Sequence, residues 1–162
     1  MKKFFIILAV IFISIENCDA QQYFKMIRDN ANKVVNNPNS SEELIDINQF
    51  EITALNYIGA QVAKRGLDMP ELFYDIQAVS LKLFVDDFLY NLLEARKISS
   101  AKKKEVIDCF QKASSQFPLF KDTDKRTTNI YMTNNSLTPF SLDTDWEKAY
   151  ELVSQKIKTI MK

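Results

Sequence analysis

The sequence contains no histidine, and this absence excludes several kinds of enzyme. Histidine is the commonest general base and a frequent metal ligand in proteins. Triad hydrolases, cysteine-histidine proteases and histidine-ligated zinc enzymes are therefore excluded in their usual forms. The chain of 162 residues also has only 2 glycines, which excludes the glycine-rich loops that bind phosphate groups. Any catalysis must use carboxylates, lysines, hydroxyls or a thiol.

The chain carries no net charge, because 21 lysines and arginines balance 21 acidic residues. Nucleic-acid binding depends on clustered cationic side chains, so no nucleic-acid partner is predicted. The run Lys102 to Lys104 could bind an anionic surface. We interpret it instead as a solvated helix face, which is the usual place for three lysines in a neutral protein.

No hydrophobic run is long enough to span a membrane, but the first twenty residues follow the pattern of a secretory signal peptide. Lys2 and Lys3 precede an apolar run from Phe4 to Ile13, and a polar stretch ends in a small residue. A membrane-spanning helix needs about 20 apolar residues. We expect cleavage between Ala20 and Gln21, and a periplasmic or secreted protein without a transmembrane helix.

The chain has only 2 cysteines, and Cys18 lies within the predicted signal peptide. An alternative interpretation makes Cys18 the acylated cysteine of a bacterial lipoprotein. After cleavage Cys109 is the only thiol, so no disulfide can form within the mature chain. Its neighbours on one helical face are apolar, which favours a buried side chain over a reactive nucleophile.

Residues 21–162 are predicted to form one all-α domain, an antiparallel bundle of about five helices. Apolar residues recur with helical spacing, and no stretch shows sustained strand alternation. Ser40 with Glu43 and Thr144 with Glu147 have capping-box spacing, and Gly66 is suited to end a helix. The predicted helices cover about 23–35, from Ser40 to Gly66, 70–96, 99–116 and 145–161.

The helix predicted at 70–96 is the longest and has two apolar faces, so we expect it at the centre with neighbours on both sides. One face contains Leu72, Val79, Leu83 and Tyr90. The other contains Tyr74, Leu81, Val85, Phe88 and Leu92. The aromatic residues Phe84, Phe88, Tyr90, Phe110, Phe117, Phe120 and Trp146 are predicted to form the core.

A polar stripe on this helix is a candidate binding site, formed by Gln77, Ser80, Asp87, Asn91 and Glu94. If a groove opens there, Asp87 and Glu94 lie two turns apart and could act as acid and base of a small hydrolase of cell-wall or glycan substrates. A solvated face is the favoured interpretation, because two carboxylates on one helix are common.

The segment 118–143 has no clear periodicity, and such long segments tend to be functional, disordered or partly helical. We expect a short helix around 124–132 and irregular structure beyond. Candidate calcium ligands are Asp122, Asp124, Asp143 and Asp145. The glycine and distal glutamate of a calcium loop are missing, so helix capping is favoured and no metal or cofactor is predicted.

The segments 117–122 and 137–146, joined to a helix with Gln77-Ala78 and the run 84–88, resemble a group of small exported helical proteins from Bacteroidetes-type bacteria. The resemblance extends over about residues 49–162. It implies a Gram-negative exported protein and carries over no functional residues.

These observations favour a non-enzymatic exported protein that binds another protein or an envelope component. Its binding surface is expected at 118–143, where polar side chains concentrate. One alternative is the carboxylate-dependent hydrolase, with Asp87 and Glu94 or the Asp122/Asp143 region as acid and base. The other is a calcium-stabilised binding module. The partner and the oligomeric state are left open by the sequence.

Overall fold

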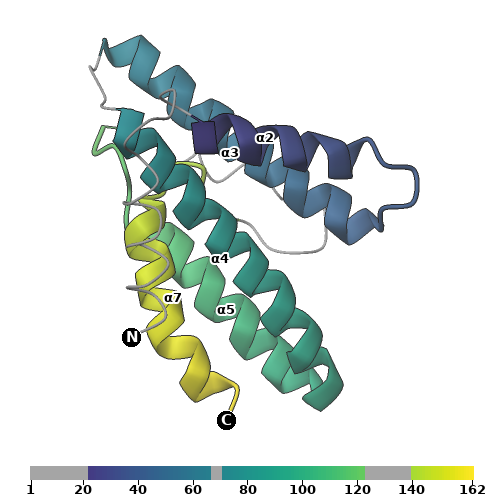
Figure 1. Cartoon of the computed structure of the whole chain (residues 1–162). Helices are drawn as coiled ribbons and strands as arrows, with labels where there is room; N and C mark the ends of the chain where they lie inside the picture. Colours follow the sequence, from purple (N-terminus) through teal and green to yellow (C-terminus); the bar gives the residue numbers. More distant parts are fainter. Residues whose placement is uncertain (1–21, 67–70, 123–139) are drawn as a thin grey trace.

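The structure is a computed structural model that describes residues 22–66, 71–122 and 140–162, and these residues form an all-α fold without strands. The prediction of a helical bundle is confirmed (Figure 1). The predicted signal peptide, its cleavage site at Ala20 and Gln21, and the predicted helix at 124–132 lie outside the described residues. The described helices are α2 (Gln22–Val35), α3 (Glu42–Arg65), α4 (Glu71–Ile98), α5 (Ser100–Gln116) and α7 (Trp146–Ile160).

Helix α4 is at the centre of the fold, because it contacts each of the other four described helices. Helices α4, α5 and α7 run side by side as one bundle (Figure 1). Helices α2 and α3 form an antiparallel pair that lies across α4 at an angle (Figure 1). Phe24 fixes the start of α2 to α4. Its ring meets that of Tyr74 edge-on with the centroids 5.5 Å apart, and its backbone N–H donates to Asp75 Oδ1 at 3.0 Å.

Two predicted helix ends are confirmed. Gly66 ends α3 with φ 58°, a left-handed conformation that favours glycine, and its N–H donates to the carbonyl groups of Ala63 and Val62. Ser99 precedes α5, and its hydroxyl accepts the N–H of Lys102 at 3.1 Å. Each contact pairs a polar backbone group that the helix itself leaves without a partner.

Two predicted caps are wrong by one residue. Helix α3 is capped by Ser41, which accepts from Leu44 N, whereas the Ser40 hydroxyl donates to Val34 O at 2.8 Å and closes α2. Helix α7 is capped by Asp145. Thr144 is buried instead, and its hydroxyl is 2.7 Å from Ser114 O. In both cases two neighbouring residues can cap a helix, and a contact outside the helix engages one of them.

The core is built around six aromatic rings, five from the helices α3, α4, α5 and α7 and one from the residues before α7. Phe140 contacts Phe50, Phe84 and Phe88 at centroid distances of 5.1 to 5.4 Å. The full set is Phe50, Phe84, Phe88, Phe110, Phe140 and Trp146. The predicted core is confirmed for Phe84, Phe88, Phe110, Phe120 and Trp146, whereas Phe117 is only half-buried. It is wrong for Tyr90, which is 64% exposed because it lies on the side of α4 away from the other described helices.

Candidate functional site

The segments on either side of residues 123–139 lie against each other. Asp145 N donates to Phe117 O at 2.8 Å, and Phe120 N donates to Asp143 Oδ1 at 3.1 Å. The Asp143 side chain is buried and holds the backbone that follows α5. These contacts fix the start of α7 next to the end of α5.

The candidate calcium ligands are engaged in three different contacts. Asp145 caps α7 and binds Lys148 at 2.5 Å, while Asp143 ties the two segments together. Asp122 pairs with Arg65 at 2.6 Å, and this guanidinium holds the pKa of the Asp122 carboxyl below its usual value. Asp124 lies outside the described residues. Within the ranges that the structure describes, no group of three or more potential ligands is close enough to hold a metal ion.

Gln77, the first residue of the polar stripe, is buried and fixes the N-terminus of α7. Its Oε1 accepts the N–H of Trp146 at 2.8 Å, and its Nε2 donates to Asp145 Oδ1 at 3.3 Å. The residue therefore joins α4 to a helix end that would otherwise have a buried N–H without a partner. The interpretation as a solvated face is wrong for Gln77 because α7 packs on this part of α4.

The other members of the stripe do not form one open surface. Asn91 is buried, and its Nδ2 donates to Asp87 O at 2.7 Å, so the solvated-face interpretation is wrong there too. Glu94 binds Lys97 at 2.6 Å on the outside, and Ser80 is half-buried. Burial raises the pKa of the Asp87 carboxyl, Asp86 raises it further, and Lys158 opposes the change.

The hydrolase alternative stays a prediction. Asp87 has the raised pKa that a general acid needs, with burial as its main cause. The second carboxylate, Glu94, is instead engaged by the ammonium group of Lys97.

Glu51 on α3 is the most unusual ionisable group of the described residues, and the sequence analysis missed it. Its side chain is 1% exposed, and neither carboxylate oxygen has a hydrogen-bond partner. Loss of water raises the pKa of Glu51 to about 7, against the opposing field of Lys82 and with a smaller rise from Asp86. The spacing of Ile47, Glu51, Leu55 and Ile58 places the carboxyl on the apolar face of α3, which is the signal that could have found it.

A second feature is an apolar face of α4 that the described helices leave largely open, although Val79 on it packs against the core. We call it the outer face; it contains Leu72, Ile76, Val79, Leu83, Asp86, Tyr90, Leu93 and Lys97. Leu72, Tyr90 and Leu93 are 43%, 64% and 51% exposed, and the other three apolar members are half-buried. The expectation that neighbours cover both apolar faces of this helix is therefore wrong. The face with Tyr74, Leu81, Val85, Phe88 and Leu92 packs against neighbours, whereas Val79 is the one member of the other predicted face among the described residues that packs against the core.

The remaining chemical candidates have structural roles. Cys109 is half-buried, and burial raises the pKa of its thiol, which disfavours the reactive thiolate. Lys102 is not fully solvated, because its ammonium group donates to Ile160 O and pairs with Glu105 at 3.2 Å. It thereby joins the start of α5 to the end of α7.

Comparison with known proteins identifies no relative. The chain matches no protein-family model, no curated protein and no solved structure. In the part of the chain that the structure describes, no helix is both long enough and apolar enough to cross a membrane.

Proposed function

We propose that this chain is an exported, non-enzymatic protein that binds another protein through the outer face of α4. The observation that carries the proposal is the exposure of large apolar side chains along one helix. Leu72, Tyr90 and Leu93 are 40% exposed or more, and they recur on the same side of α4. Large apolar surface rimmed by charged side chains is typical of protein-binding sites.

Export rests on the signal-peptide pattern of residues 1–20, and periplasmic or secreted location is part of the proposal. The lack of histidine supports a binding role over catalysis. The outer face takes the place of segment 118–143 as the proposed binding surface. The reason is that Phe120, Phe140 and Asp143 on the flanks of that segment are buried in the fold.

The test is co-purification from the native envelope with three forms of the protein: wild type, Leu93→Glu and Met26→Glu. Met26 is the matched control, because it is 48% exposed but lies on α2. Proteins that the wild type and Met26→Glu retain should be lost with Leu93→Glu, since a carboxylate in an apolar contact is costly. Equal retention by all three forms would contradict the proposal.

A further inference from the structure

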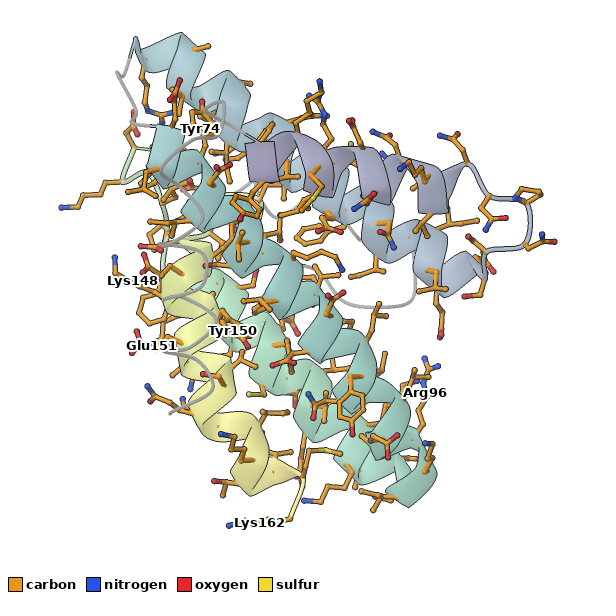
Figure 2. The ribbon with its side chains drawn as sticks, viewed as in Figure 1. Tyr74, Arg96, Lys148, Tyr150, Glu151 and Lys162 are labelled. Atoms are coloured by element: carbon orange, nitrogen blue, oxygen red, sulfur yellow. The ribbon has the colours of Figure 1, made fainter. Side chains whose placement is uncertain are left out.

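One end of the bundle formed by α4, α5 and α7 concentrates positive charge. Helix α4 ends there, α5 begins there and α7 ends there (Figure 1). The ammonium group of Lys102 donates to Ile160 O and so fixes the start of α5 against the end of α7. Arg96 and Lys162 both lie at this end (Figure 2). We call it the basic end; its basic side chains are Arg96, Lys97, Lys102, Lys103, Lys104, Lys156, Lys158 and Lys162.

The protein neutralises only part of this charge. Within the described residues three ion pairs form at the basic end: Arg96 with Glu43, Lys97 with Glu94, and Lys102 with Glu105. The other five lysines of the basic end form no ion pair with any residue that the structure describes. Lys158 acts on Asp87 through its field alone. Because the whole chain carries no net charge, this excess at one end is balanced by acidic residues elsewhere.

The stability of α5 does not account for its lysines. The N-terminal end of a helix carries a partial positive charge, which favours acidic side chains there. Helices α3, α4 and α7 each have an acidic residue in the first turn, whereas α5 has none and carries three consecutive lysines from Lys102 to Lys104. The cations at the ends of α4 and α7 add repulsion between like charges. The arrangement therefore lowers the stability of the single chain, and bound anions would relieve the repulsion.

An exposed apolar side chain lies between the cations of α4 and those of α5 in the sequence. Ile98 is the last residue of α4, directly follows Lys97 and is 57% exposed. A soluble anion such as phosphate offers this side chain no apolar contact. A lipid membrane instead places anionic headgroups next to apolar acyl chains, which matches lysines around an exposed isoleucine.

From this combination we propose that the basic end binds the anionic headgroups of a lipid membrane, with Ile98 inserted between them. The proposal goes beyond the proposed function, because it concerns a different surface and a different partner from those of the outer face. Clusters of about four to eight basic residues are typical of binding to acidic lipids. Each lysine close to such a membrane raises the affinity by about fivefold.

The test is sedimentation of the protein, purified from its native envelope, with two kinds of lipid vesicle. One contains phosphatidylglycerol mixed with phosphatidylcholine, and the other contains phosphatidylcholine alone. The protein should bind the vesicles with phosphatidylglycerol, and should dissociate from them at about 0.5 M salt, where charges are screened within a few Å. It should not bind the neutral vesicles.

The variant that tests the lysines combines Lys104→Gln with Lys162→Gln, one from the start of α5 and one beyond the end of α7. Both side chains are exposed, and the loss of two lysines should weaken binding to the anionic vesicles by about 25-fold. The matched control combines Lys25→Gln with Lys33→Gln, which removes the same charge from exposed positions on α2. Helix α2 lies away from the basic end (Figure 1), so the control should bind as the wild type does.

Ile98→Ser separates a membrane from a free anion, because it keeps every charge and removes the apolar side chain. It should weaken binding to the anionic vesicles by about fivefold. Far-UV circular dichroism verifies that each variant is folded, and residues 1–20 contribute equally to all forms because none of the substitutions lies there.

Equal binding to the two kinds of vesicle, binding to neither, or the same loss of binding in the α2 control would overturn the proposal. Soluble glycerol phosphate at constant ionic strength should not displace the protein from the vesicles. Displacement by glycerol phosphate together with unchanged binding of Ile98→Ser would assign the basic end to a free anion instead, and would equally overturn the membrane proposal.

Discussion

The buried carboxyl of Glu51 makes the stability of this protein depend on pH in a direction opposite to that of most acidic groups. Its pKa rises from 4.5 to about 7 because the folded chain removes both oxygens from water without replacing their hydrogen bonds. The folded state therefore binds this proton more tightly than the unfolded state does. Stability from this group is fully present below pH 4.5 and is lost as the pH rises through about 7.

The size of the effect follows from the two pKa values. Each pH unit between 4.5 and about 7 changes the free energy of unfolding by about 1.4 kcal/mol. The folded state thus loses about 3 kcal/mol over this window, a large part of the stability of an ordinary domain. Charged groups that act on Glu51 come from α4, where Lys82 and Asp86 partly oppose each other and are themselves paired.

The assay is urea unfolding of wild type and Glu51→Gln between pH 4 and 8, followed by circular dichroism. Glutamine keeps the shape of the side chain and cannot ionise, so the variant should gain up to about 3 kcal/mol over wild type as the pH rises. Glu151→Gln is the matched control, because Glu151 is exposed on α7 (Figure 2). Its free energy of unfolding should change with pH as that of the wild type does. Parallel pH profiles for wild type and Glu51→Gln would refute the reasoning.

Two further predictions concern helix ends and are checked by denaturant unfolding. Gly66→Ala should cost about 1 kcal/mol, because an added Cβ is strained at φ 58° even though it meets no atom within 4 Å. Gly59→Ala, inside α3 and equally free of contacts, should instead stabilise by about 0.5 to 1 kcal/mol. Gln77→Ala should cost about 1 to 3 kcal/mol, since Trp146 N loses its acceptor inside the protein. Equal changes in unfolding free energy for Gly66→Ala and Gly59→Ala would contradict the strain expected at Gly66. An unchanged unfolding free energy for Gln77→Ala would mean that its contact with Trp146 does not stabilise the fold.

The helices were predictable because their signals are local. Apolar spacing and the turn chemistry of Gly66 and Ser99 depend on residues within a few positions of each other. Helix α4 was predicted from about 70 to 96 and extends from Glu71 to Ile98. A local signal locates a helix to within one or two residues, and this is how far the predicted ends differ from those observed.

The candidate sites were less predictable, because they depend on which faces meet. Gln77 and Glu94 belong to the same polar stripe, yet one is buried under α7 and the other pairs with Lys97 in solvent. The spacing of Glu51 places it in an apolar row of α3, but its loss of water also requires that other helices bury this row, which the local sequence does not determine. The aromatic contacts of Phe140 likewise arise between segments that are far apart in the sequence.

Substitutions at two adjacent residues distinguish the outer face of α4 from the side of α4 that packs in the core. Leu92 is 1% exposed and belongs to the core, whereas Leu93 is 51% exposed on the outer face. Leu92→Ala leaves a cavity among packed side chains and should cost about 2 to 5 kcal/mol of unfolding free energy. Leu93→Ala removes little buried surface in the single chain and should change it by no more than about 0.5 kcal/mol at dilute protein.

The same two residues then distinguish folding from partner binding. A protein that binds the folded state adds stability by mass action, so a partner retained by the wild type should raise its free energy of unfolding. Leu93→Ala should reduce this gain, and Leu92→Ala should keep it on a lower baseline, wherever the variant remains folded. A loss of unfolding free energy by Leu93→Ala as large as that of Leu92→Ala at dilute protein would mean that the outer face belongs to the core.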